Sequence, residues 1–452
     1  MFIVLTTWAL AAALPAAAHG VGGRIDLPIP VWQFAWAAAL AVIVSFAMLG
    51  RFWTRPRLES AAPGVSLPEL AQAIGRLCVP LARLVGLAAF VVLLYAALVG
   101  SREVTSNIAP YAVFIVFWVG VQLVSAVIGD VWAGLDPFRT LADIGAWLRA
   151  EAIRQPMSPA GHGAGNRWWA VGAMFTFVWL ELAYHGGASP RSIGAYLSLY
   201  TGVMVVGASV RGRGWVKDAD GFGVLFGILA AMAPLNRDRS GTWRLRSPVA
   251  GLATLEASPA TVRLILVVLG STTFDGFARS SLWLDVVSNR SGWILTALNT
   301  GGLIFGIGVV MFVYRMAIAA MARTTGEPED ELGDAFAPSL LPIVVAYTVA
   351  HYFSYLVLDG QAVIRLASDP FGMGWDLFGS TGYRVDYTLL STAAIAWIQT
   401  AAIAVGHVLA VLVAHDRAVE RYPHPLAVRS QYPMLAAMIV YTVSGLLLLL
   451  GG

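Results

Sequence analysis

A histidine lies deep inside one apolar stretch of this chain, followed at regular spacing by a tyrosine and an aspartate. In the run VAYTVAHYFSYLVLDGQ, His351, Tyr355 and Asp359 follow one another every four residues. That spacing places all three close to one stripe of a helix. Because an ionisable group inside a membrane-spanning segment is costly, it marks a functional site. We therefore expect His351, Tyr355 and Asp359 to take part in catalysis.

Two more apolar stretches carry acidic residues or histidine near their ends. Glu181 and His185 are four residues apart in one stretch, and Asp275 ends the other in TTFDGFARSS. Imidazole and carboxylate groups suit zinc, manganese or iron, and a bound divalent ion would turn water into a nucleophile near neutral pH. The sequence therefore predicts a metal site formed by Glu181, His185, Asp275 and His351. No HExxH run fixes this geometry, so helix caps or ion pairs with Arg279 are the alternative.

The start of the chain has the pattern of a secretory signal peptide. A short apolar region at residues 2–14 precedes Ala16-Ala17-Ala18, which is a small-residue cleavage pattern. We expect residues 1–18 to be removed, with an uncleaved anchor as the alternative. Cleavage would leave His19 at the N-terminus, where its amine and imidazole would form a further metal site, suited to copper.

The composition is that of a membrane protein. Of 452 residues, 58% are hydrophobic and 12% are charged, and the mean hydropathy is +0.72, whereas an average soluble domain has about 25% charged residues. The net charge is only +3 and the sequence contains no nucleic-acid-binding motif, so nucleic acid is not expected as a partner. The single cysteine, Cys78, excludes an intrachain disulfide. We expect an all-α polytopic transmembrane bundle in which residues 19–452 form one membrane domain.

The elements that must position these side chains are predicted from the lengths of the apolar runs. A membrane-spanning helix needs about 20 apolar residues. The apolar segment at 222–235 is shorter than that, so we interpret it as a cytoplasmic interfacial or re-entrant helix. Ten runs are close to the required length and are predicted to span: about 31–50, 80–100, 109–129, 168–184, 192–210, 260–275, 292–314, 337–358, 392–414 and 433–450.

The basic residues predict which ends of these helices face the cytoplasm. With the mature N-terminus outside, 19 Lys and Arg residues fall in inner loops and 7 in outer segments. Because cytoplasmic loops carry an excess of Lys and Arg, this distribution favours an outside N-terminus. The longest outer loop, at about 359–391, contains SDPFGMGWDLFG and is expected to form a structured cap. The predicted site lies on the same, extracytoplasmic side.

Several long motifs resemble those of a bacterial membrane-protein family. The chain is similar, over nearly its whole length, to bacterial integral-membrane proteins named fenitrothion hydrolases, which are organophosphate triester hydrolases. This resemblance implies a lipophilic organophosphate or related ester as substrate, and it implies no particular set of catalytic residues. The motifs that carry it are HGVGGRIDLPIP, GDVWAGLDPF, TFDGFARSS, AHYFSYLVLDGQ, SDPFGMGWDLFG, DYTLLS and GHVLAVLVAHDRA.

Three functions are compatible with these observations. The first is a membrane-embedded hydrolase in which metal-bound hydroxide attacks the ester and Tyr355 or His185 assists the leaving group. The second is a proton- or metal-ion-linked transporter or channel that uses the same acids and histidines as a path. The third is a copper- or haem-linked membrane protein, although His407 should lie roughly 9 Å deeper than His351, which argues against both binding one haem. The expected partners are the bilayer and a lipophilic small molecule, and a second subunit is left open.

Overall fold

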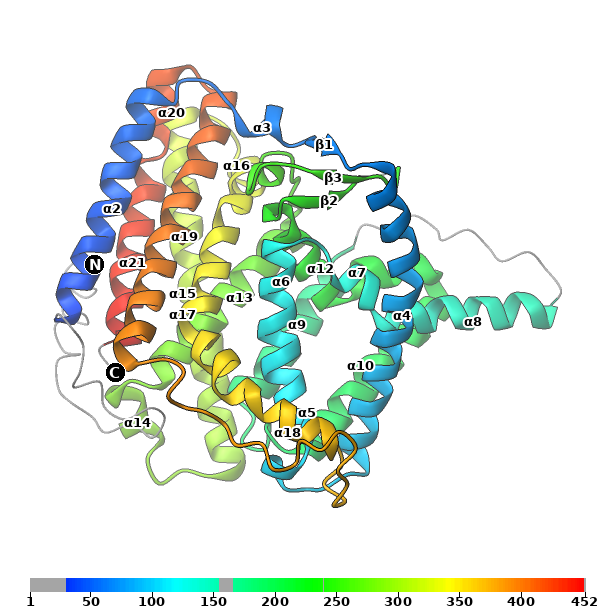
Figure 1. The fold of residues 1–452 in the computed structure, drawn as a ribbon. Coiled ribbons are helices and arrows are strands. Elements are labelled where there is room, and N and C mark those ends of the chain that lie inside the picture. Colours follow the sequence, from blue (N-terminus) through cyan, green and yellow to red (C-terminus); the bar gives the residue numbers. More distant parts are fainter. Residues whose placement is uncertain (1–29, 154–165, 239, 451–452) are drawn as a thin grey trace.

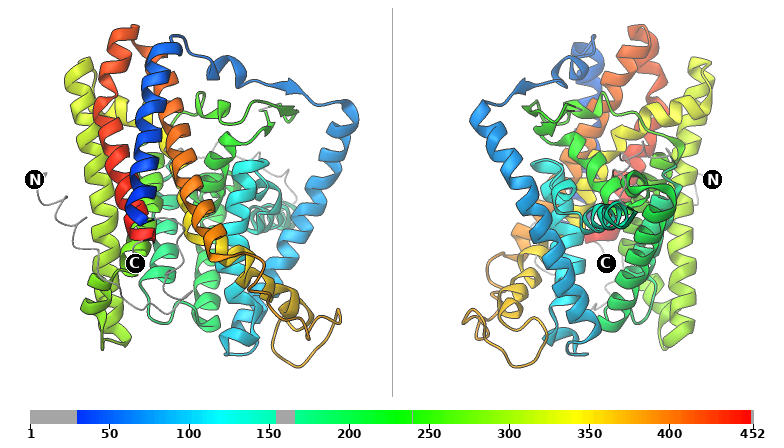
Figure 2. Two further views of the ribbon diagram at one scale, coloured as in Figure 1. Left: turned by 60° about the vertical axis from the view of Figure 1, so that its left-hand side comes forward. Right: turned by 90° about the vertical axis from the view of Figure 1, so that its right-hand side faces the viewer.

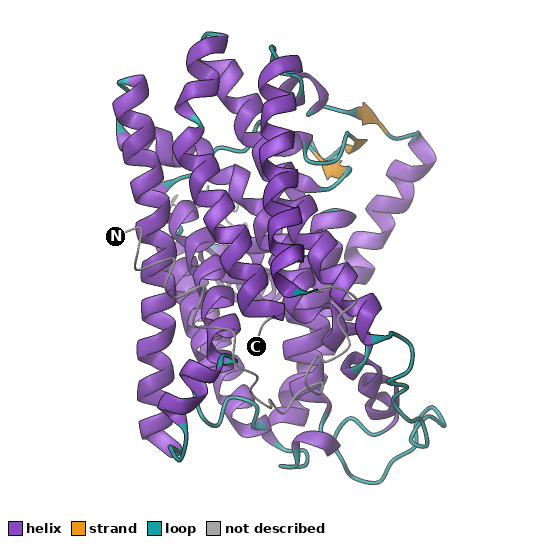
Figure 3. Cartoon of the chain, turned by 90° about the vertical axis from the view of Figure 1, so that its left-hand side faces the viewer, coloured by secondary structure: helices purple, strands orange, loops and turns teal. Residues whose placement is uncertain are grey.

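The structure is a computed structural model, and it describes residues 30–153, 166–238 and 240–450. Helices make up nearly all of the regular structure, and they run side by side in a bundle (Figure 1, Figure 3). The predicted signal segment and His19 lie outside the described residues.

Nine helical segments in the described part of the chain are long and apolar enough to cross a membrane. The predicted all-α polytopic bundle is thereby confirmed. Three of the nine segments are built from shorter helices with at most one residue between them: α5 (Ile108–Tyr111), η2 (Ala112–Val121) and α6 (Gln122–Val127); α16 (Glu329–Phe336), η6 (Ala337–Leu340) and α17 (Leu341–Val357); and α20 (His424–Ser430) with α21 (Tyr432–Leu450). The other six are α2 (Val31–Phe52), α4 (Glu69–Leu98), α10 (Pro190–Arg211), α13 (Pro259–Ala278), α15 (Gly292–Thr325) and α19 (Thr392–Arg421).

One of the ten predicted spans, at 168–184, is not among these nine segments. It is the apolar helix α9 (Trp168–Leu182), which has 15 residues. Its length is short for a complete crossing of the bilayer. The segment predicted at 222–235 is shorter still. It forms α12 (Gly221–Leu229) and the 3₁₀ turn η4 (Ala230–Met232), and most of its side chains are buried among other helices. Helix α12 thus packs inside the protein, and its predicted interfacial or re-entrant position remains a prediction.

Local sequence explains where several of these helices begin and end. Ser258 accepts a hydrogen bond from the backbone N–H of Thr261 at the start of α13, and Pro259 occupies the first helical position. Serine caps and an N-terminal proline are both favoured there. Helix α15 ends just before Gly326, which has a φ of 78°. Glycine adopts this left-handed conformation without steric cost, and it commonly ends a helix.

Many of the loops gather at two opposite ends of the bundle (Figure 1). At one end, strand β1 (Val65–Ser66) pairs with β3 (Trp243–Leu245), which also pairs with β2 (Leu235–Arg237) in a small antiparallel sheet. At the other end, the backbone N–H of Ser101 donates to the carbonyl of Phe371 at 2.7 Å. Figure 1 shows the sheet and α20 at the top, and α14 (Ser281–Val287) and α18 (Ala362–Ser368) at the bottom.

Short helices complete the structure around the bundle. Helix α8 begins against the bundle, where Asp143 pairs with Arg83 and Arg213. It projects to the side of the bundle in Figure 1 and is seen nearly end-on in the right-hand view of Figure 2. These short elements are α3 (Leu58–Ala61), η1 (Val104–Ser106), α7 (Trp132–Leu135), α8 (Pro137–Ile153), η3 (Arg213–Trp215), α11 (Val216–Ala219), η5 (Ala250–Leu252) and η7 (Asp359–Gln361).

Helix α13 lies at the centre of the bundle and carries Asp275. Of its most apolar stretch, 83% is buried by the rest of the protein. It lies very close to α15, because a Cβ atom built at Gly270 would fall 2.4 Å from the Cα of Ile307. Glycines allow such close approach of helix backbones inside a membrane. This contact fixes the end of α13 that bears Asp275 relative to its neighbours.

Candidate functional site

Asp275 and His351 meet in the interior of the bundle. The Nδ1 atom of His351 lies 3.2 Å from Oδ2 of Asp275, and the two residues are 4% and 7% exposed. A carboxylate accepts hydrogen bonds, so Nδ1 is the donor in this contact and Nε2 lies outside it. The pair joins α13 to α17, two helices that are separated by long stretches of sequence. It is an oriented histidine whose second nitrogen is available as a base.

Arg279 balances the charge of Asp275. Its guanidinium donates to both carboxylate oxygens, at 3.2 and 3.1 Å, from one helical turn further along the chain. The Tyr352 hydroxyl also interacts with Asp275. The Glu181 carboxylate is near enough to be repelled by Asp275 and attracted by Arg279. A buried carboxylate is tolerated only when it is paired and hydrogen-bonded, and the contacts of Asp275 with Arg279, His351 and Tyr352 meet that condition.

Gly276 gives the histidine ring its space. A Cβ atom built at this glycine would lie 3.2 Å from Cε1 of His351 and 3.8 Å from its Nε2. A larger residue at position 276 would therefore crowd the ring. On another side, the ring of Tyr347 lies parallel to it within 25°, with centroids 6.0 Å apart.

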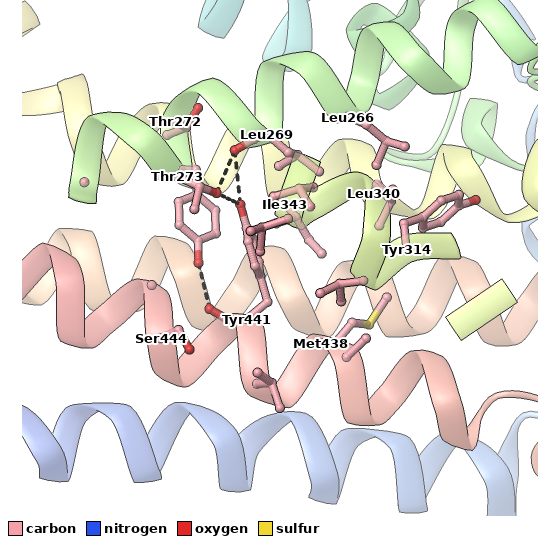
Figure 4. Close-up of a pocket in the computed structure, with 18 of the residues that line it drawn as sticks. Leu266, Leu269, Thr272, Thr273, Tyr314, Leu340, Ile343, Met438, Tyr441 and Ser444 are labelled. Atoms are coloured by element: carbon pink, nitrogen blue, oxygen red, sulfur yellow. Dashed lines mark hydrogen bonds between the residues drawn. The ribbon is translucent and has the colours of Figure 1, made fainter. Parts of the chain in front are cut away.

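His351 lines a long apolar pocket between α13, α15, α17 and α21 (Figure 4). The pocket has an empty volume of about 1040 Å³, part of which is open to the surroundings. Its walls are leucine, isoleucine, valine and methionine side chains, with a few hydroxyl groups. Ligand pockets have this character in general: mostly apolar walls with a small number of placed polar groups.

Tyrosine side chains fix the wall of this pocket next to the histidine. Tyr347 donates through its hydroxyl to the backbone carbonyl of Tyr441 at 3.0 Å, and the Tyr441 hydroxyl lies 2.8 Å from Oγ1 of Thr273 (Figure 4). These bonds link α17, α21 and α13. Their polar atoms are thus partnered within the protein, and the space that they border stays apolar.

The structure does not assemble the four predicted metal ligands. Helix α9 ends at Leu182, so the four-residue spacing of Glu181 and His185 no longer places them on one helix face. His185 is exposed, and its Nδ1 lies 2.8 Å from Oγ1 of Thr296. Over the described residues, no group of three or more His, Cys, Asp or Glu side chains is arranged to hold a metal ion. Arg279 already supplies the positive charge beside Asp275, so this pair is a poor divalent-cation site.

Tyr355 shares α17 with His351, whereas Asp359 lies beyond that helix. Helix α17 ends at Val357, so the expected stripe is broken at Asp359, which begins the 3₁₀ turn η7. There it borders a separate polar pocket together with Arg365 and Arg384, and burial raises the pKa of its carboxyl group. Tyr355 is 40% exposed, and Arg279 lies over its ring at 5.9 Å.

The loop at 359–391 is held together by its own hydrogen bonds. The Ser368 hydroxyl accepts from the backbone N–H groups of Phe378 and Ser380. The Gln361 side chain accepts from the Tyr383 hydroxyl and from the N–H of Asp386. These contacts give the cap a defined shape at the end of the bundle nearer to Asp275.

A second buried polar centre was not predicted. Asp220 is fully buried and accepts hydrogen bonds from Nε1 of Trp132, from the Tyr200 hydroxyl, and from the N–H groups of Phe222 and Gly223. It caps α12 and joins three helices. The motif DADGFG places an aspartate directly before a glycine-rich apolar run, which is a signal for a helix cap.

His407 is also completely buried, on α19. Its Nδ1 lies 2.8 Å from the carbonyl of Ile403, and the rings of Tyr347 and Tyr441 flank it at 6.2 and 6.3 Å. Tyr347 thus lies between His351 and His407.

Comparisons with protein-family models, with curated proteins and with solved structures gave no match for this chain.

Proposed function

We propose that this protein is a membrane-embedded hydrolase of lipophilic organophosphate or carboxylic ester substrates, with His351 as its base. The observation that carries the proposal is the contact between His351 and Asp275 at the edge of an apolar pocket. The likeness of the sequence motifs to organophosphate hydrolases supports the substrate class. The proposed membrane is the bacterial cytoplasmic membrane, with the site nearer to its outer face.

The residues suggest a general-base mechanism. Nε2 of His351 takes a proton from a water molecule as the water oxygen bonds to phosphorus or to the carbonyl carbon. Asp275 holds the ring and stabilises the imidazolium that forms. The bond to the leaving oxygen then breaks, and the imidazolium returns the proton to that oxygen. Arg279 supplies a positive charge beside Asp275, so the proposed step uses no metal ion at this pair.

A proton-linked transporter is the second candidate, and one observation favours it. The rings of His351, Tyr347 and His407 follow one another through the bundle at centroid distances of 6.0 and 6.2 Å. Ionisable groups in such a row inside a membrane protein are typical of proton relays.

One experiment separates the two candidates. Purified protein is placed in lipid vesicles, and hydrolysis of a fenitrothion-like triester and of a long-chain ester is measured together with proton flux. We expect His351→Ala to lower hydrolysis by about 10²–10⁴-fold and His185→Gln to retain it, because His185 lies outside the proposed machinery. Proton flux without hydrolysis in the wild-type protein would instead support transport, and equal hydrolysis by both variants would refute the role of His351.

A further inference from the structure

We infer that the apolar pocket is an acyl-chain site, which a membrane lipid enters sideways from the bilayer between α15 and α21, with its ester group at His351. This inference names the substrate class of the proposed hydrolase. The placement of an ester group at His351 rests on the proposed hydrolase function. Binding of the acyl chain in the pocket does not, because it can be measured without any reaction.

The entrance is marked by residues that belong both to the pocket wall and to the outer surface of the bundle. Val309 on α15 and Val440 on α21 line the pocket, and they are 37% and 42% exposed. Both belong to spanning helices, so the surface that they expose faces lipid chains. On the same helix, Phe305 and Phe312 are 64% and 53% exposed, which indicates that this face of α15 is in contact with the bilayer. A molecule that passes between Val309 and Val440 therefore comes from the membrane.

The pocket is long enough for an extended chain. Along α17 its wall runs from Ile343 to His351 and begins just before that helix, at Leu340. At 1.5 Å per residue, the distance from Leu340 to His351 is about 16 Å. The lining is apolar at the end away from His351, where Leu266, Leu340 and Met434 contribute to it.

The direction of the chain follows from the position of the polar groups. His351 and Asp275 lie at one end of the pocket, and Arg279 and Tyr355 continue beyond them toward the end of the bundle that carries α14 and α18. A lipid in the leaflet on that side has its head group outward and its chain pointing to the centre of the bilayer. In this orientation its ester lies near His351, and its chain fills the apolar part of the pocket.

Photolabelling tests this inference directly. The full-length protein is reconstituted with an ether-linked phospholipid, which cannot be hydrolysed, carrying a diazirine near the end of one chain. We expect the label on residues of the apolar end, such as Leu340, Met434 and Met438. Val440→Trp, which narrows the entrance, should remove this label. Ile304→Trp, a similar change on the lipid-facing side of α15 outside the pocket, should leave it unchanged.

Competition provides a second measurement that does not depend on a variant. Unlabelled long-chain lipid should displace the label, and a short-chain analogue should not. Label confined to lipid-facing residues such as Phe312, or label insensitive to both competition and Val440→Trp, would overturn the inference. The two proposals can also fail separately. If the pocket is labelled but the protein hydrolyses no ester, only the proposed hydrolase function is refuted. Hydrolysis of a short ester without pocket labelling refutes only the acyl-chain site.

Discussion

Arg279 determines whether Asp275 and His351 are suited to binding a divalent metal ion. Its guanidinium contacts both oxygens of Asp275, so the positive charge that a divalent ion would bring is already present. We therefore expect treatment with a chelator to leave ester hydrolysis unchanged. Hydrolysis assayed before and after dialysis against a chelator checks this, with readdition of zinc or manganese as the control. Loss of activity that either metal restores would favour the metal site expected from the sequence.

Asp220 shows how one buried carboxylate fixes a local fold. The hydroxyl of Tyr200 is one of its four hydrogen-bond donors. Tyr200→Phe leaves the carboxylate with one bond fewer, which should cost about 1–3 kcal/mol of stability. Thermal unfolding in detergent measures this cost. Tyr432→Phe, at an exposed site, is the matched control, and equal melting temperatures for both variants would contradict the structural role of Asp220.

At the scale of elements, the close contact of α13 and α15 depends on glycine. Gly270→Ala would place a methyl group against the backbone of Ile307, and overpacking of this kind costs about 1–3 kcal/mol. Gly301, also in the tightly packed pair of helices, has no atom within 4 Å of a built Cβ. We expect Gly270→Ala to lower the melting temperature and Gly301→Ala to leave it unchanged. The reverse order would mean that the two helices are packed differently.

The ends of the helices were harder to predict than the helices themselves. Apolar length is a strong signal, and it predicts the spanning segments because the bilayer sets the length. Helix ends depend on local caps and turns. For this reason α9 stops at Leu182 and α17 at Val357, and the spacing arguments that linked Glu181 to His185 and His351 to Asp359 failed at those points.

For the whole molecule, the two groups of loops provide a test of orientation. The proposed arrangement has the loop at 359–391 outside and the loop after α19 inside. In a protein whose exposed native cysteine is replaced by Cys78→Ser, we expect Asp376→Cys to react with an impermeant thiol reagent in intact cells. Arg429→Cys should react only after permeabilisation. The opposite pattern would invert the orientation and place His351 nearer to the cytoplasm.

The site itself was only partly predictable, because it depends on contacts between helices. The sequence indicated His351 and Asp275 as costly ionisable residues within apolar segments. It could not show that α13 and α17 bring them within 3.2 Å, or that Arg279 completes the group. The apolar pocket could not be predicted from the sequence either. Its wall combines residues of α13, α15, α17 and α21, and each of them alone resembles a lipid-facing or core side chain.

The central claim is that Asp275 and His351 act as one unit in hydrolysis. The most direct measurement is kcat/KM for a long-chain ester in lipid vesicles, for the wild type, His351→Ala, Asp275→Asn and the double variant. Residues that act together lose activity non-additively, and loss of a general base costs about 10²–10⁴-fold. We predict a loss in that range for His351→Ala and no further loss in the double variant. Losses that multiply, or a folded His351→Ala protein with wild-type kcat/KM, would contradict the account.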